Sequence, residues 1–123
     1  MATVVYFENE VARGWLIRSA LARLPYTEVF QEFQVVVDPV TKQERLAEKQ
    51  VIRQGQDGLN STAALLNHAT SLGLAMTSGH QKDYAWAQGA MVLIKSYQSW
   101  WITEQGRAFL DGNAPLPAMP EAS

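Results

Sequence analysis

The stretch KDYAWAQGAMVLIKSYQSWWITEQ, residues 82–105, carries three of the four tryptophans of the chain and decides its predicted fold. Seven of its apolar side chains recur at helical spacing and fall within one arc of about 120° on a helical wheel. Polar residues such as Gln88 and Lys95 fall on the opposite side. The pattern predicts one long amphipathic helix, ended by Gly106, whose apolar stripe consists of Trp86, Ala90, Leu93, Ile94, Tyr97, Trp100 and Trp101.

This aromatic stripe has two interpretations. The favoured one is a core, in which the helix lies across a small sheet and its aromatic rings supply much of the buried area. The second is a contact surface, because Trp and Tyr are enriched at interface hot spots and the stripe exceeds what a small sheet can cover. The part of the stripe that the sheet leaves uncovered would then serve self-association. The candidate contacts to a partner or ligand are Tyr6, Trp15, Trp86, Tyr97, Trp100 and Trp101.

The first part of the chain alternates between strand and helix signals. Residues 3–7 are β-branched and aromatic and predict a strand. Asn9 is placed to cap a helix that ends before Pro25. Trp15 falls outside the narrow apolar stripe of this helix, and packing under a later segment is favoured over exposure. Residues 27–37 form the clearest predicted strand of the chain.

A second capped helix is predicted after the turn signal Asp57-Gly58. Ser61 is its expected N-cap, and Gly73 followed by Leu74 suits a Schellman-type end. Inward positions are expected at Leu65, Leu66, Ala69 and Leu72.

Residues 40–53 allow two structures. Asp38-Pro39 begins either the turn of a hairpin, with a return strand over 44–53, or a helix with Pro39 at its first position. The helical wheel slightly favours the helix, because it separates a basic side from an apolar one. As a cationic ridge, the basic set would offer candidate anion contacts at Lys42, Arg45, Lys49 and Arg53, although a solvated charged face is the favoured interpretation.

Together these elements predict an α+β fold in a single compact domain, residues 1–111. We expect a small sheet of two to four strands covered by three or four helices, in the order β-α-β-(β or α)-α-α. Residues 112–123 are rich in Pro and Ala and predict a disordered tail.

The composition argues against most kinds of enzymatic catalysis and metal binding. The chain has no Cys, two His and a net charge of −2, and no metal-ligand cluster, phosphate loop or nucleophile–base pair is found in it. We therefore expect no cofactor and no metal, lean against an enzyme, and regard nucleic acid as an improbable partner. The start of the chain lacks the features of a signal peptide and no window is long and apolar enough for a membrane span, so a cytoplasmic location is expected.

The N-terminal half resembles the N-terminal domain of glutathione transferases. The similarity rests on the strand-like 4–7, on Arg13-Gly14 and on Asp57-Gly58-Leu59 followed by Ser61. It implies a thioredoxin fold, with Tyr6 as the thiol-activating tyrosine and Ser61 as a contact to glutathione. The chain departs from that family where Val51-Ile52-Arg53 replaces the Val-Pro step, and the residues after Ser61 are too few for the helical second domain.

Three functions follow from these features. The first is a small non-enzymatic interaction protein that binds a protein partner or itself, such as an adaptor, structural component or inhibitor of the kind common among phage and mobile-element products. The second is a small-molecule site lined by Tyr6, Glu8, Glu10 and Trp86. The third, ranked lowest, is nucleic-acid binding through the basic set.

Overall fold

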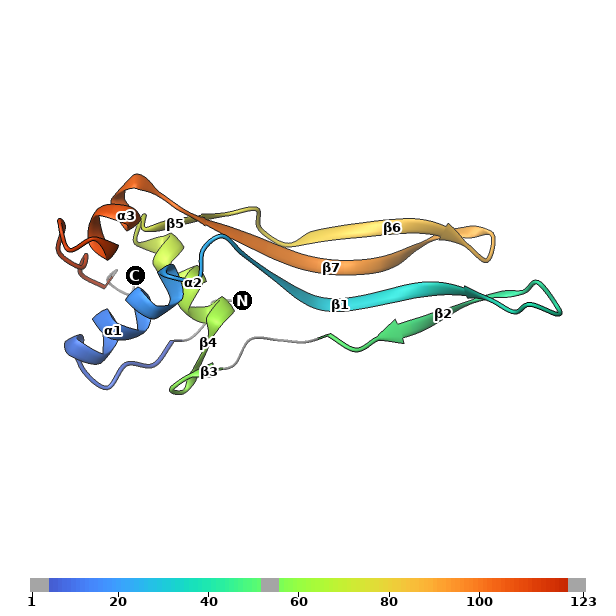
Figure 1. Cartoon of the computed structure of the whole chain (residues 1–123), viewed down its shortest axis with the longest axis horizontal. Coiled ribbons are helices and arrows are strands. Elements are labelled where there is room, and N and C mark those ends of the chain that lie inside the picture. Colours follow the sequence, from blue (N-terminus) through green and yellow to red (C-terminus); the bar gives the residue numbers. More distant parts are fainter. Residues whose placement is uncertain (1–4, 52–55, 120–123) are drawn as a thin grey trace. The chain divides into compact units, whose positions relative to one another are not determined.

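The structure, a computed structural model, describes residues 5–51 and 56–119. The chain forms two compact units. The helical unit comprises Met1–Tyr26, Gln54–Thr77 and Ser99–Ser123, and the β-unit comprises Thr27–Arg53 and Ser78–Gln98. Figure 1 labels the elements of both.

The helical unit contains the three helices, and a polar side chain caps the start of each. They are α1 (Glu10–Leu21), α2 (Thr62–Ser71) and α3 (Glu104–Leu110). The side-chain oxygens of Asn9, Ser61 and Thr103 accept hydrogen bonds from backbone amides of the first turns, at 2.8, 3.1 and 3.0 Å. Because these amides have no partner within the helix, the caps fix where each helix begins.

The apolar core of the molecule lies in this helical unit. Buried side chains come from all three helices, from Leu74 after α2, from strand β5 (Ala75–Thr77) and from the end of strand β7 (Ala90–Ile102). The core residues are Ile17, Ala20, Leu21, Leu65, Leu66, Ala69, Leu74, Ala75, Trp100 and Phe109.

Helix α2 ends in the predicted Schellman motif. The amide of Leu74 donates to the carbonyl of Ala69 (3.0 Å), and the amide of Gly73 donates to that of Thr70 (3.1 Å). Gly73 has a φ of 81°, which a residue with a side chain rarely adopts. The chain then forms β5 (Ala75–Thr77), which pairs with the end of β7, while β3 (Gln56–Asp57) and β4 (Asn60–Ser61) form a short hairpin before α2.

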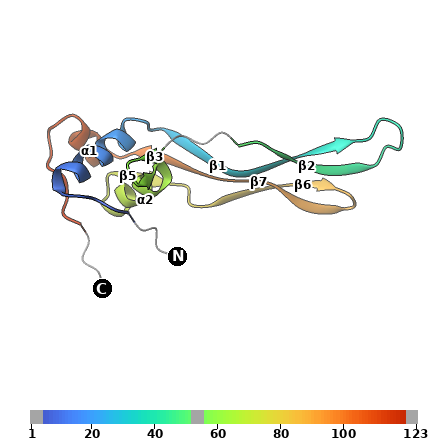
Figure 2. The ribbon, with the colours of Figure 1, turned by 90° about the horizontal axis from the view of Figure 1, so that it is seen from below.

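The β-unit is made of two long antiparallel hairpins, as Figure 1 shows. One joins β1 (Tyr26–Val37) to β2 (Glu44–Lys49), and the other joins β6 (Gln81–Ala87) to β7 (Ala90–Ile102). The central strands β1 and β7 pair with each other, so the order within this unit is β2-β1-β7-β6. The described residues of the unit include no helix. Figure 1 shows the two hairpins side by side, and Figure 2 shows them from the edge, where their ribbons overlap.

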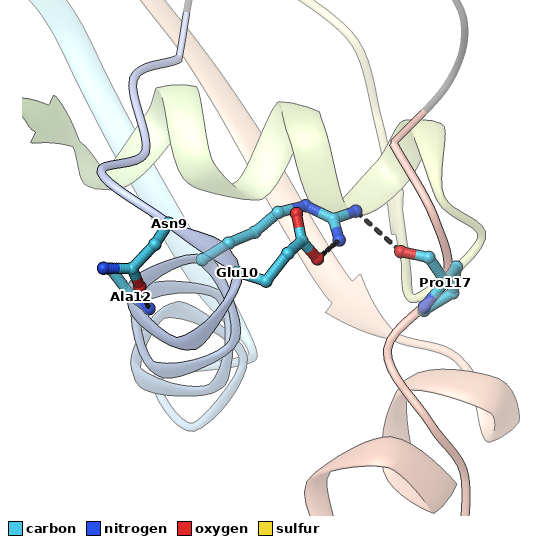
Figure 3. A network of polar contacts seen from close by, with 5 residues as sticks. Asn9, Glu10, Ala12 and Pro117 are labelled. Atoms are coloured by element: carbon cyan, nitrogen blue, oxygen red, sulfur yellow. Dashed lines mark hydrogen bonds and ion pairs between the residues drawn. The ribbon is translucent and has the colours of Figure 1, made fainter.

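The residues after α3 are attached to the helical unit. The Arg13 guanidinium Nη2 donates to the carbonyl oxygen of Pro117 at 2.7 Å, and its Nη1 donates to Glu10 at 3.1 Å (Figure 3). Leu116 packs against the core cluster that contains Phe109. Within residues 112–123, for which the sequence predicts disorder, Leu116 and Pro117 make these specific contacts, and residues 120–123 lie outside the described part.

The predicted helix over 82–105 is wrong. This stretch folds into β6, a two-residue turn and β7, followed by α3. The turn residues Gln88 and Gly89 have φ values of 54° and 77°, the backbone of the tight turns that favour hairpins. Gly106 does not end a helix but lies within α3, packed closely against the backbone of Leu74.

The predicted fold class is wrong for the same reason. The main sheet has five strands, and the β-unit that contains most of it has no helix among its described residues, so a small sheet covered by helices is not what forms. Residues 5–7 are not a strand, and residues 3–4 lie outside the described part. The hairpin interpretation of 40–53 is confirmed for its return strand Glu44–Lys49, and the slightly favoured helix is wrong.

Candidate interaction surface

The β-unit has almost no apolar core of its own. Among the described residues with a buried apolar side chain, only Ala87 belongs to it. Its other buried side chains are polar and come from the central strands, namely Glu28, Ser96 and Gln98. A sheet usually buries at least one face against another layer. We infer that either face of this sheet could be buried by a partner.

One face of the β6–β7 hairpin gathers large exposed apolar side chains. Tyr84 lies opposite Leu93, and Trp86 lies opposite Met91. Opposed residues of an antiparallel pair project on the same side of the sheet, and so do residues two apart. The four residues Tyr84, Trp86, Met91 and Leu93 therefore form one patch, called here the aromatic face. Its members Tyr84, Trp86 and Met91 are 54%, 68% and 59% exposed.

A β-bulge places the aromatic face on its side of the sheet. The register passes from Asp83–Lys95 to Tyr84–Leu93, which leaves Ile94 as an extra residue. Such a residue increases the local twist and shifts the following side chains by one position. Without it, Tyr84 would oppose Ile94 instead of Leu93.

The tips of the two hairpins are joined by hydrogen bonds from Gln88. Its backbone amide donates to the carboxylate of Glu44 (3.1 Å), and its side-chain amide donates to the backbone carbonyl of the same residue (2.8 Å). This contact ties the β6–β7 turn to the start of β2 and so fixes the end of the hairpin that carries Trp86.

The two edge strands of the β-unit differ in charge. Within the described residues, neither β2 nor β6 has a second strand beside it. Strand β2 carries charge at four of its six positions, including Lys49, which pairs with Glu32 at 3.1 Å. In β6 the charges are confined to Lys82 and Asp83, and the half nearer the turn is Tyr84-Ala85-Trp86-Ala87. Charged side chains are the usual protection of an exposed edge, so β6 is the less protected one.

A smaller exposed apolar surface lies on α1. Trp15 is 75% exposed, so the favoured prediction that it packs under another segment is wrong. Val11, one turn earlier, is also exposed. Trp15 borders a shallow hollow of about 430 Å³ together with Arg18, Ser19 and Ala22.

A second hollow of the helical unit brings together two of the residues predicted to line a ligand site. Tyr6 and Glu8 border a space of about 360 Å³, together with Ala12, Leu16, Gly58, Leu59 and Asn60. The side chain of Asn60 holds the backbone of Tyr6, accepting from its amide (2.8 Å) and donating to its carbonyl (2.7 Å). Glu10 pairs with Arg13 instead, and Trp86 belongs to the β-unit.

The remaining aromatic candidates do not form one surface. Trp100 is fully buried, and Trp101 is exposed beside Met76 across the β5–β7 pair. Tyr97 is half-buried in the β-unit, with the Lys95 ammonium 5.1 Å from the centre of its ring.

The basic candidates are also separated. Lys42 lies in the β1–β2 turn with a φ of 62°. Arg45 and Lys49 project from the same side of β2, whereas Arg53 lies outside the described residues. The cationic helical ridge is therefore absent from this part of the chain.

One half-buried histidine of the helical unit has a buried ring nitrogen. His68 of α2 is 5.3 Å from Phe7 between ring centres, and its Nε2 is buried without a hydrogen-bond partner in the described residues. Burial, together with the positive charge of Arg13, lowers the pKa of His68 below its usual value.

Sequence reasoning missed Tyr84 and Met91 as surface residues. Both were assigned to a helix, in which they lie outside the aromatic stripe. The alternation of Tyr84, Ala85, Trp86 and Ala87 before the turn pair Gln88-Gly89 was the signal that would have found them.

The described residues hold no cluster of three or more side chains suited to a metal, and no helix formed by them is long and apolar enough to cross a membrane. The first strand implied by the thioredoxin-fold resemblance is not formed, because residues 5–7 around Tyr6 are not a strand. Ser61, the implied contact to glutathione, accepts a hydrogen bond from the first turn of α2 as its N-cap. The chain matches no protein-family model, and comparisons with curated proteins and with solved structures give no match.

Proposed function

We propose that this chain is a non-enzymatic interaction protein, an adaptor or structural component that binds a protein surface through its β-unit. The observation that carries the proposal is the aromatic face on a sheet without a core. The helical unit, which holds the core, would supply the folding stability of the chain.

The physical argument rests on the cost of exposed apolar area. Trp86, Tyr84 and Met91 are adjacent and each more than half exposed, whereas scattered single exposures are the norm for surface residues. Covering such area with a partner removes it from water and is favourable by roughly 25 cal/mol per Å². Trp, Tyr and Met are also the residue types enriched where protein interfaces are buried.

The test replaces the two aromatic residues of this face by polar ones. Tyr84→Gln with Trp86→Gln should abolish association, whether with a second copy or with a captured protein, without lowering the melting temperature of the helical unit. The matched control is Val40→Gln, which removes another exposed apolar side chain of the β-unit, in the β1–β2 turn. Association is measured by light scattering for the chain alone and by affinity capture for a partner. Unchanged association in the double variant, or equal loss in the control, would refute the proposal.

The hollow beside Tyr6 favours a second candidate function, the binding of a small molecule. Its volume of about 360 Å³ falls within the usual range of ligand sites, and Glu8 supplies a charged group at its border. A thermal-shift screen that includes glutathione and nucleotides tests this. A ligand that stabilises the wild-type chain and not Tyr6→Ala supports the site, and a flat response across the panel argues against it.

A further inference from the structure

We propose that the outer edge of β6 pairs with β6 of a second copy of this chain, antiparallel and centred on Ala85, so that one sheet continues through both copies. This inference rests on the proposed function and names the partner of the same surface. The partner strand would supply hydrogen bonds to the outer edge of β6, beside which the described residues place no second strand.

The charges of the two edge strands decide which edge can pair with itself. In an antiparallel pairing of β2 with its own copy centred on Leu46, each Glu44 would lie opposite Glu48 of the second copy. Like charges directly opposed destabilise a sheet. The stretch Tyr84–Ala87 of β6 has no charged side chain, so it can face its own copy without this repulsion.

The same argument excludes two registers of β6 and permits the one centred on Ala85. Centring the pair on Lys82 or on Asp83 would oppose two equal charges. Centring it on Ala85 places each Asp83 opposite Ala87 of the second copy and each Lys82 opposite Gln88. These contacts bring no like charges together.

This register also joins the aromatic faces of the two copies. Tyr84 of one copy lies opposite Trp86 of the other, and the pair occurs twice. Aromatic cross-strand pairs are among the more stabilising in antiparallel sheets. Met91 and Leu93 lie one strand behind them in each copy, so the combined patch would extend over four strands.

The area involved predicts a weak dimer. An aromatic side chain offers about 150–250 Å². With Tyr84 and Trp86 exposed to 54% and 68%, the pair therefore contributes roughly 250 Å² per copy. Interfaces below about 1,000 Å² in total are weak or transient, so we expect association that depends on protein concentration.

The absence of Cys from the chain allows a direct test by disulfide trapping. In the variant Ala85→Cys the two thiols would be on directly opposed residues, whose Cα atoms are about 4.5–5.5 Å apart, a separation that a disulfide spans. The control is Asp83→Cys, which projects on the same side of β6. Its two thiols would be four residues out of register, roughly 13 Å apart along the strand.

Under mild oxidation of the full chain, we expect Ala85→Cys to form a covalent dimer at least tenfold faster than Asp83→Cys. Adding Tyr84→Gln and Trp86→Gln to Ala85→Cys should abolish this advantage. Without any cysteine, Ala85→Lys should keep the chain monomeric by light scattering at concentrations where the wild type dimerises, because two lysines would then be opposed. Circular dichroism establishes that each variant is folded.

Equal trapping in the two cysteine variants, or a wild type that stays monomeric at all concentrations, would overturn the pairing. The proposed function is tested independently of this pairing. If the pairing is absent but capture of another protein still depends on Trp86, the β-unit is an interaction surface for a different partner. If neither depends on Trp86, both proposals are refuted.

Discussion

The indole nitrogen of Trp100 donates a hydrogen bond to the side-chain oxygen of Asn67 across 3.2 Å, which joins the end of β7 to α2. Trp100 is fully buried, and the ring of Tyr26 stacks on it with centres 5.9 Å apart. It packs with Ala20, Leu65 and Leu66. Of the two interpretations of the aromatic stripe, the favoured one, a core position, therefore holds for Trp100, which does not act as a contact residue.

Replacing Trp100 by Ala should destabilise the helical unit by about 3–5 kcal/mol, because a cavity forms and Asn67 loses a hydrogen-bond donor. Urea unfolding followed by circular dichroism measures the change. Trp101→Ala is the matched control, because its side chain is exposed, and we expect it to change stability by less than about 1 kcal/mol. Similar effects of the two substitutions would contradict the assignment of Trp100 to the core.

Two helical glycines should respond oppositely to Ala. A Cβ on Gly106 would collide with the backbone carbonyl of Leu74, which cannot move aside as a flexible side chain does. Gly106→Ala should cost about 1–3 kcal/mol in spite of its better helix propensity. In α1, a Cβ on Gly14 would meet only Leu116 Cδ2 at 3.9 Å, so Gly14→Ala should stabilise by up to about 1 kcal/mol. Thermal unfolding of both variants shows whether each substitution raises or lowers the stability of the helical unit. Stabilisation by Gly106→Ala would show that α3 is free to shift away from Leu74.

The sequence predicted the parts of the fold whose signals are local. Asn9 and Ser61 are N-caps as expected, Gly73 ends α2, and β1 occupies almost the predicted range. Each of these depends on the chemistry of a few neighbouring residues, such as a side-chain oxygen beside free amides or a glycine in the left-handed region. Such features do not require knowledge of the rest of the chain.

The β6–β7 hairpin could not be assigned from its apolar spacing alone. In residues 82–105 apolar side chains occur on both sides of a strand and also along a helical arc, so both periods fit. The turn pair Gln88-Gly89, with its positive φ values, decides for the hairpin, whereas the bulge at Ile94 leaves no local signal. The aromatic face was missed with the hairpin, although Trp86 itself was a candidate.

Unfolding of the helical unit should depend on pH through His68. Burial and the charge of Arg13 lower its pKa in the folded state, so the unfolded chain binds the proton more tightly. The contribution of neutral His68 to the free energy of unfolding is fully present above about pH 6.5, the usual pKa of histidine. It is lost as the pH falls toward the lowered pKa of His68 in the folded state. The free energy of unfolding should therefore be smaller at pH 5.5 than at pH 7.5.

His68→Gln should flatten this pH dependence, as measured by urea unfolding at the two pH values. His80→Gln is the control, since it removes the other histidine of the chain. If the slope survives in His68→Gln and disappears in His80→Gln, the titrating group has been assigned to the wrong residue.

The buried Arg13 should hold the segment after α3. Its guanidinium is almost fully buried, donates to the carbonyl of Pro117 and leaves Nε without a hydrogen-bond partner in the described residues. In Arg13→Ala this anchor is lost, and a hydrogen bond to a charged group contributes about 1.5–3 kcal/mol. We expect residues 112–119 to be cleaved several-fold faster by a nonspecific protease, while the folded remainder persists.

Glu10→Gln provides the control for Arg13→Ala. The Glu10 side chain is exposed, and an ion pair with one exposed partner contributes little, so cleavage of the segment should stay near the wild-type rate. Mass spectrometry of the fragments locates the cuts. If Arg13→Ala leaves the segment protected, the packing of Leu116 against the core is sufficient to hold it, and the guanidinium serves only to fill the space between α1 and Pro117.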